Sequence, residues 1–413
     1  MKSRHVFALV ASCVATVALA ACTTPAAYNA TMTFRPIDVP AFASMQIVDK
    51  DVVWGVSSTN SLWRSQDAGR AWRRVSLPGL PGSPVSLVLD PLSSRVAWIA
   101  ASSTTAVAAA PRAAVRLFKT TDGGRTWAML PEPHGTQGLP LASSADFLNA
   151  YDGWLVLQAP HGMGSSPGVL YRTTNGGVTW RPVSRTPIMN VPPEASPAQT
   201  LPVAGQIEFT SPENGWLVGG WISTGPRSLY ATTDGGANWR LVALPTIPTG
   251  ATFESVLAAP RSDGDLLTVP IAYQGASGQT CVVLLRSLDR GQSWQPGALL
   301  TGGVNVSLLS AHVALALRLG EYDPQHPNRN VPASLWRTDD GGVTWHLMAN
   351  LSRVLKSQLA GPLVGLSMTF LNVRTGVIWA TQYNARGAQR TLWIDETTDG
   401  GRTWIHRWPA ARH

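Results

Sequence analysis

The sequence predicts an all-β fold, a seven-bladed β-propeller built from four-stranded antiparallel blades. Three observations lead to this prediction. The composition suits short strands and turns, one eight-residue phrase recurs seven times at nearly constant spacing, and an apolar strand-like run precedes each copy. Units of four short strands at a fixed period are typical of propeller blades.

The composition is poor in the residues that cover surface helices. Only 14% of the 413 residues are charged, against roughly 25% in ordinary soluble domains. The chain also contains 38 Gly and 31 Pro, which favour turns. Its apolar content of 44% is too high for a disordered chain. We therefore expect short strands joined by many turns.

The recurring phrase is Thr-Thr-Asp-Gly-Gly-x-Thr-Trp with variations, and its Trp residues follow one another at intervals of 51 to 59 residues. The Asp or Asn side chain accepts hydrogen bonds from amides of its own turn, and the glycine two residues later permits positive φ. The Trp begins the outgoing strand and fills a gap between neighbouring sheets. We expect scaffold roles for Asp67, Trp72, Asp122, Trp127, Asn175, Trp180, Asp234, Trp239, Asp289, Trp294, Asp340, Trp345, Asp399 and Trp404.

Two further elements complete each repeat. A strand that ends in an apolar or aromatic pair precedes the turn, as at Leu229-Tyr230. Further upstream lies a hairpin with a Gly-Trp pair, clearest at Gly215-Trp216. Each repeat therefore has four strands, A to D, with the recurring turn between C and D. Blades 5 and 6 lack the Gly-Trp pair, and Arg290 replaces the first glycine of the turn in blade 5.

The propeller is expected to occupy residues 42–410. The expected blades are 42–81, 84–132, 142–188, 203–247, 251–300, 303–350 and 364–410. How the ring closes stays open. The stretch from Thr33 to Ile37 resembles an outermost strand and could pair beside the last blade.

The amino terminus predicts export. Residues 1–21 have the form of a signal peptide, because Lys2 and Arg4 precede an uncharged apolar run that is shorter than the ~20 residues of a membrane helix. The run ends in Leu-Ala-Ala-Cys, which resembles the bacterial lipobox. That resemblance implies cleavage before Cys22, lipid attachment to its thiol, and a tether over residues 22–41. The alternative is an ordinary signal peptide.

This reading predicts a protein held on the extracytoplasmic side of a bacterial membrane, the outer membrane where the host has two. Removing Lys2 and Arg4 lowers the net charge from +8 to +6. No run of basic residues indicates nucleic-acid binding. Of the 32 basic residues, 28 are Arg, which reflects either genomic base composition or a surface for carboxylates, phosphates or anionic lipid. Cys281 lies in an apolar run that predicts a buried strand.

The recurring turn and the Gly-Trp hairpin together resemble a known group of repeats. The turn is similar to the Asp-box, or BNR, repeat. The combination resembles the Ycf48/Hcf136-like propellers, named for a photosystem II assembly factor, and more distantly the Vps10 domain of sortilin and the sialidase and xyloglucanase propellers. The resemblance covers roughly residues 42–408. It implies the propeller fold and a binding or assembly role.

In propellers, the A–B and C–D turns share one face of the ring, and the B–C and D–A loops share the other. The long segments of this chain mostly fall between strands B and C, and loops on a rigid scaffold commonly bind ligands. The alternative for any one residue is a plain solvated loop. The candidate binding residues are Arg112, His161, Glu321, Tyr322, Asp323, His326, Arg329, Tyr383, Arg386 and Arg390.

Catalytic and metal-binding signatures are weak. Residues 164–168 match Gly-x-Ser-x-Gly, but that motif needs a strand-to-helix turn, and this copy lies in a Pro-containing loop. The eight His show no pair at metal-ligand spacing, so no metal or cofactor is expected. The acids of the expected loop face are Glu132, Glu321 and Asp323.

Two functions follow from these observations. The first is a monomeric, lipid-anchored and non-catalytic module that binds a protein or glycan as an assembly scaffold. The alternative is a glycoside hydrolase of sialidase type that acts on extracellular glycans. They differ in whether paired carboxylates, ~5–9 Å apart, converge at the central tunnel.

Overall fold

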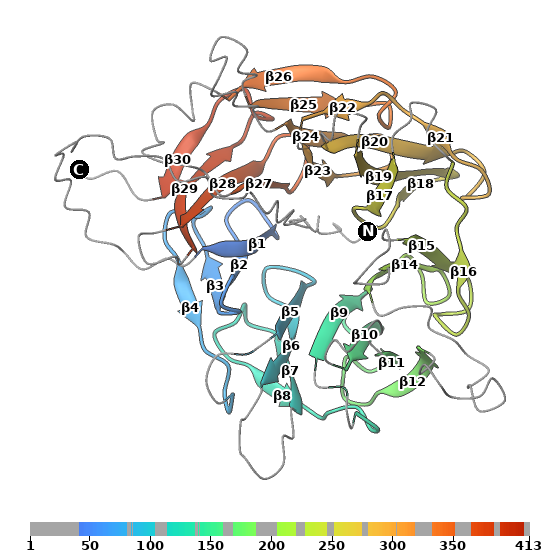
Figure 1. The fold of residues 1–413 in the computed structure, drawn as a ribbon. Coiled ribbons are helices and arrows are strands. Elements are labelled where there is room, and N and C mark those ends of the chain that lie inside the picture. The colour runs from blue at the N-terminus through green and yellow to red at the C-terminus, as the bar shows by residue number, and fades with distance from the viewer. Residues whose placement is uncertain are drawn as a thin grey trace, which may run out of the picture.

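The structure, a computed structural model, is a ring of seven antiparallel sheets around a central axis (Figure 1). It describes residues 41–80, 84, 86–103, 114–136, 139, 141–159, 168–186, 205–219, 228–245, 252–274, 280–302, 304–318, 333–351, 365–383 and 389–408. Six sheets contain four strands in chain order, and one contains six. The predicted all-β, seven-bladed propeller is confirmed.

Each blade runs from an inner strand A to an outer strand D. Blade 1 contains β1 (Phe42–Ile47), β2 (Val53–Ser57), β3 (Leu62–Ser65) and β4 (Arg73–Val75). Blade 2 contains β5 (Ser86–Pro91), β6 (Ala97–Ser103), β7 (Ala114–Thr120) and β8 (Ala128–Leu130). Blade 3 contains β9 (Leu141–Phe147), β10 (Gly153–Gln158), β11 (Gly168–Thr173) and β12 (Arg181–Arg185). Blade 4 contains β13 (Gln206–Phe209), β14 (Gly215–Gly219), β15 (Ser228–Thr232) and β16 (Arg240–Leu241).

The second half of the ring repeats this order. Blade 5 contains β17 (Thr252–Val256), β18 (Arg261–Asp263), β19 (Leu266–Gln274), β20 (Thr280–Ser287), β21 (Gln295–Pro296) and β22 (Leu300–Thr301). Blade 6 contains β23 (Val304–Leu308), β24 (Ala314–Arg318), β25 (Ser334–Thr338) and β26 (His346–Asn350). Blade 7 contains β27 (Gly365–Phe370), β28 (Gly376–Tyr383), β29 (Gln389–Thr397) and β30 (Ile405–Trp408).

Blade 5 departs from the expected four strands. A short strand, β18, pairs with the start of β19, and the outer strand is divided into β21 and β22. The division follows Pro296, which has no amide hydrogen to donate. The Gly297 amide still donates to the Leu284 carbonyl of its own sheet at 2.9 Å, but the Ala298 amide donates to the carbonyl of Gly342 in blade 6 at 2.7 Å. The outer strand therefore leaves its own sheet at this point and bonds to the next blade.

Tryptophans of strand B fill the interfaces between blades. The indole of Trp154 in blade 3 stacks on Phe209 in blade 4, with ring centroids 3.7 Å apart. Its Nε1 donates to the carbonyl of Gly235, in the recurring turn of blade 4, at 3.0 Å. The glycine beside this Trp is required by packing, because a Cβ on Gly153 would lie 2.3 Å from the ring of Phe147. In the Gly-Trp pair, the glycine thus leaves room for the Phe147 ring of its own blade, and the Trp packs against the next blade.

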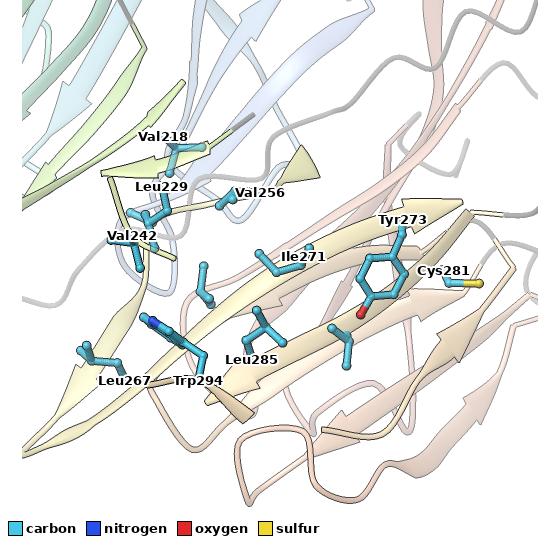
Figure 2. Close-up of a cluster of buried hydrophobic side chains, with 13 residues drawn as sticks. Val218, Leu229, Val242, Val256, Leu267, Ile271, Tyr273, Cys281, Leu285 and Trp294 are labelled. Carbon is cyan, nitrogen blue, oxygen red and sulfur yellow. The ribbon is translucent and has the colours of Figure 1, made fainter. Parts of the chain in front are cut away.

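Aliphatic side chains pack the remaining interfaces. Between blades 4 and 5, Val218 and Leu229 from one sheet meet Ile271, Leu285 and Trp294 from the other (Figure 2). Burial of such side chains contributes roughly 1.5–3 kcal/mol each. Blades 5 and 6, which lack the Gly-Trp pair, use strand-C leucines against the next turn, Leu284 on Gly342 and Leu335 on Gly401.

The ring closes by packing between two complete blades. All four strands of blade 7 come from β27–β30, so no strand is exchanged between the described parts of blades 1 and 7. The hydroxyl of Thr391 accepts a hydrogen bond from the amide of Phe42 at 3.2 Å. Val377 and Ile394 pack against Phe42 and Met45. The stretch 33–37, considered above for closure, lies outside the described residues.

Candidate functional site

Most of the predicted binding residues lie outside the part of the chain that the structure describes. These are Arg112, His161, Glu321, Tyr322, Asp323, His326, Arg329 and Arg386, and the predicted lipid-attachment residue Cys22 lies outside it as well. The backbones of Tyr383 and Arg390 are described, and they pair with Gln389 and Gln382 at the ends of β28 and β29. Both therefore stand beside the B–C connection of blade 7, and the loop-face site stays a prediction.

The recurring turn has the same hydrogen bonds in all seven blades. In blade 6, the Thr338 hydroxyl donates to Asp340 at 2.7 Å, and it accepts from the Gly342 amide at 2.8 Å. Asp340 also accepts from the Thr344 amide at 3.0 Å. The equivalent acceptors are Asp67, Asp122, Asn175, Asp234, Asp289 and Asp399.

A further bond fixes this turn to the A–B turn of the same blade. In six blades, the amide that follows the Asp or Asn by one residue donates to an A–B carbonyl at 2.7–2.8 Å, as from Gly341 to His312. The two kinds of turn therefore share one face of the ring, which we call the turn face. The Trp of each copy stands directly before strand D. The turn residues are fully engaged in local bonds, which is a scaffold arrangement.

These bonds also stabilise the ionised carboxylates. Burial raises the pKa of Asp340, but hydrogen bonds from the hydroxyl and amide of Thr344 and from Thr338 outweigh burial and hold the pKa at about 2. The pKa of Asp399 is held at about 2 by the equivalent balance. In Asp122, the hydroxyl of Thr126 is the leading cause of a pKa well below the usual range.

Three acids on the inner strands link neighbouring blades. Each of the three accepts a hydrogen bond from, or forms an ion pair with, the next blade. The links run from Asp90 to the amide of Phe147 (2.6 Å), from Asp146 to the amide of Phe209 (2.6 Å), and from Glu208 to the guanidinium of Arg261. These are carboxylates of the kind that a hydrolase would need near the ring axis, and here they hold blades together.

The turn face contains a pocket between blades 1 and 2, with a volume of about 490 Å³. Its wall includes the side chain of Arg64, which is 4% exposed. The Arg64 guanidinium lies 5.2 Å from the ring centroid of Trp54, and its Nη2 donates to the Ser94 carbonyl at 3.0 Å. Its Nε and Nη1 have no acceptor among the described residues. Burial lowers the pKa of Arg64, and Arg73 and Arg125 lower it further, whereas the carboxylates of Asp49 and Asp122 act in the opposite direction.

The rest of the pocket wall carries charges of both signs. Arg95 and Arg125 supply positive charge, and Asp49, Asp51 and Asp122 supply negative charge. The three acids have local partners. Asp49 accepts from two amides of its own turn, Asp51 pairs with Lys50, and Asp122 is bonded within the recurring turn. The pocket is thus a polar site with a buried guanidinium at one side.

The turns of blades 7, 1 and 2 are rich in arginine, and two of these residues, Arg95 and Arg125, line the pocket. The position after the second glycine of the recurring turn is Arg in these three blades and Val, Ala or Gln in blades 3–6. The A–B turns of blades 2 and 7 add one Arg each. We call this set, all exposed, the arginine surface: Arg70, Arg95, Arg125, Arg374 and Arg402. None of the five forms an ion pair within the described residues.

On the turn face of blades 3–6, three acids have basic partners. Asp152 lies 3.7 Å from Arg172, Asp265 lies 2.7 Å from Arg290, and Asp263 lies 3.5 Å from His312. The sequence interpretation treated the recurring turn as scaffold and missed this asymmetry. The signal was present, since an Arg follows the second glycine in only three of seven copies.

Two further features of the described part of the chain bear on the site. It contains no group of three or more His, Cys, Asp or Glu side chains placed to hold a metal ion. It also contains no helix long and apolar enough to cross a membrane.

No protein-family profile matches the chain. Over 205 residues it is 27% identical to a xyloglucanase from a Paenibacillus species, a match that covers 45% of this chain and 19% of that enzyme. The chain therefore spans less than a fifth of that relative. Among solved structures, YCF48 from Cyanidioschyzon merolae is 16% identical, with 86% of this chain and 94% of that chain covered and a TM-score of 0.49. An ancestral GH74 enzyme is 14% identical, with 90% and 50% covered and a TM-score of 0.48.

Proposed function

We propose that the protein is an exported, lipid-anchored and non-catalytic propeller that holds a protein or glycan partner at the cell envelope. The observation that supports the proposal is that three acids of the inner strands are bonded to neighbouring blades. Asp90, Asp146 and Glu208 each bond to the next blade, so they serve the ring and are not presented to a substrate. A rigid ring with variable connections is the usual form of a binding scaffold.

The membrane attachment in this proposal rests on the sequence of residues 1–22. Lipid on Cys22 and the tether over residues 22–41 would hold the ring close to the membrane surface. The partner would then be another component of the envelope, which the ring binds through the loop face formed by the B–C and D–A connections.

A second function deserves a test because of one comparison. The 27% identity to a xyloglucanase covers 45% of this chain, and a hydrolase would act on extracellular glycans. Such an activity needs two carboxylates about 5–9 Å apart, one of which either activates a water molecule or attacks the sugar itself. Its acids would come from Glu132 or from Glu321 and Asp323.

The test is affinity capture from detergent-solubilised membranes with the lipid-bearing protein. The variant to compare is Tyr322→Ala, Arg329→Ala and Arg386→Ala. A matched control removes the same residue types at exposed described positions, Tyr151→Ala, Arg181→Ala and Arg240→Ala. We expect one envelope partner to be recovered with the wild type and the control and lost with the first variant. Equal recovery with all three proteins, or no specific partner together with glycan turnover, would overturn the proposal.

A further inference from the structure

The pocket between blades 1 and 2 is walled by the A–B turn and the recurring turn of each blade. In blade 1 the Ala68 amide donates to the Asp51 carbonyl at 2.8 Å, which joins the two turns. In blade 2 the Gly123 amide and the Arg95 carbonyl join them in the same way. The shape of the pocket is therefore fixed before a ligand binds, which favours affinity. Its volume of about 490 Å³ lies within the range of roughly 300–1,000 Å³ that is usual for small-ligand sites.

The wall of this pocket is polar, and its formal charges cancel. It contains three arginines and three aspartates, and Val52 is the one aliphatic side chain among its described residues. An apolar ligand would leave the charged groups without water or a partner, which is costly. An anion would be repelled by the aspartates, and a cation would be repelled by the arginines. The wall therefore suits a neutral polar ligand.

The aspartates are acceptors whose oxygens are already engaged by local donors. Asp49 accepts from two amides of its own turn, and Asp51 pairs with Lys50 at 2.9 Å. Asp122 accepts from the amide and the hydroxyl of Thr126. The ammonium group of a ligand would compete with these donors. A hydroxyl group needs a single lone pair, and an ionised carboxylate offers about four lone-pair sites.

Arg64 supplies the buried donor of the pocket. It is 4% exposed, and its described partners are the Ser94 carbonyl and the ring of Trp54. The comparably buried Arg261 and Arg407 each bond to a carboxylate. A buried guanidinium that lacks a carboxylate partner is costly. Oxygen acceptors brought into the pocket would lower that cost.

A saccharide suits both kinds of wall group at once. Each of its hydroxyl groups can accept a hydrogen bond from an arginine and donate one to an aspartate. A sugar ring presents such hydroxyls on adjacent carbons and carries no charge that the wall would repel. We propose that this pocket binds one or two sugar units of a neutral glycan. The proposal goes beyond the function assigned to the loop face, because it places a second ligand on the opposite face of the ring.

The test is saturation-transfer NMR with the full chain in detergent. The neutral probes are maltotriose, cellotriose, mannotriose and triacetylchitotriose. The charged probes are chitosan triose, which is cationic, trigalacturonate, which is anionic, and phosphocholine, which is a zwitterion. We expect at least one neutral trisaccharide to bind with a Kd of about 1 mM or lower, and at least about tenfold more tightly than every charged probe.

The pocket variant is Asp51→Ala with Arg95→Ala, which removes one acceptor and one donor from the wall and leaves the net charge unchanged. Both side chains are exposed, so we expect the fold to be retained. The variant should weaken the best neutral probe by about tenfold or more. The matched control is Asp265→Ala with Arg290→Ala, an exposed ion pair on the turn face of blade 5. It should change the Kd by less than about twofold.

Three results would overturn the inference: no neutral probe saturates, a charged probe binds most tightly, or the pocket variant and the control lose equal affinity. Capture of an envelope partner through the loop face does not depend on this pocket, so the pocket variant should retain that partner. If the sugar probes fail while the partner is still captured, the loop-face function stands and the glycan pocket is refuted.

Discussion

Replacing Trp154 with phenylalanine is expected to destabilise the ring at the interface between blades 3 and 4. The Trp154 side chain is completely buried. It stacks on Phe209 with an interplanar angle of 5°, donates from Nε1 to the Gly235 carbonyl, and lies under the guanidinium of Arg172 at 4.9 Å. Phenylalanine retains an aromatic ring but loses the donor and part of the volume.

The expected cost follows from three contributions. The Gly235 carbonyl loses its donor, which costs about 1 kcal/mol. The volume left by the missing pyrrole part of the indole costs about 1–2 kcal/mol, because the neighbouring sheets relax only in part. A smaller ring under Arg172 loses about 0.5 kcal/mol of cation–π attraction. We therefore expect the free energy of unfolding to fall by about 3 kcal/mol.

The assay is urea unfolding followed by circular dichroism, with Trp63→Phe as the matched control. Trp63 is half-buried, and its Nε1 has no acceptor among the described residues, so that variant should lose less than about 1 kcal/mol. A double-mutant cycle with Phe209→Leu should give a coupling energy of about 1 kcal/mol for the stacked pair. A loss in Trp154→Phe no larger than in the control would refute the role assigned to strand-B tryptophans.

Four other substitutions test the remaining structural claims, the first two by the same urea unfolding and the last two by thermal melts. Arg290 has φ of 59° in the blade 5 turn, a backbone conformation that is unfavourable for residues other than glycine. Arg290→Gly should therefore raise the free energy of unfolding by about 0.5–1 kcal/mol, although it removes an exposed ion pair. A decrease would contradict the claim that the backbone of this turn is strained. In Gly153→Ala the new Cβ would meet the Phe147 ring at 2.3 Å, which should cost about 1–3 kcal/mol, and an unchanged midpoint would show that the ring moves freely. Asp340 has a pKa of about 2, below its usual 3.8, so it stabilises the fold above pH 3.8 and loses that contribution as the pH falls towards 2. In thermal melts from pH 5 to 2, the melting temperature of Asp340→Asn should therefore fall less with pH than that of the wild type, and the melting temperature of Asn175→Asp should fall more. Parallel curves would show that the carboxylate hydrogen bonds do not cause the pH dependence of stability.

The fold was predictable because local chemistry repeats. Seven copies of one turn, each with a side-chain acceptor and a Trp, fix the number of blades and the strand order within each blade. The division of the outer strand of blade 5 was not predicted, because it accompanies a bond from the Ala298 amide to Gly342 in the next blade. A contact between blades of this kind leaves no periodic trace in the sequence.

The site was less predictable for the same reason. Residue types marked the loop candidates, but they say nothing about which side chains converge. The role of Asp90 and Asp146 as links to the next blade follows from the spacing of inner strands, which no local pattern encodes. The arginine surface is visible in the sequence as a variation within the recurring turn. That its members lie on neighbouring blades depends on how the ring closes, which places blades 7, 1 and 2 side by side (Figure 1).

The most direct test of the central claim, that the ring binds and does not catalyse, is a hydrolysis assay with the full chain. The substrates are xyloglucan, followed by reducing-end release, and a sialoside, followed by free sialic acid. The blanks are the triple variant Glu132→Gln, Glu321→Gln and Asp323→Asn and a heat-denatured sample. The account predicts product release no greater than in the denatured sample for both substrates. Sustained turnover by the wild type that falls in the triple variant, while the variant keeps its folded circular dichroism spectrum, would contradict it.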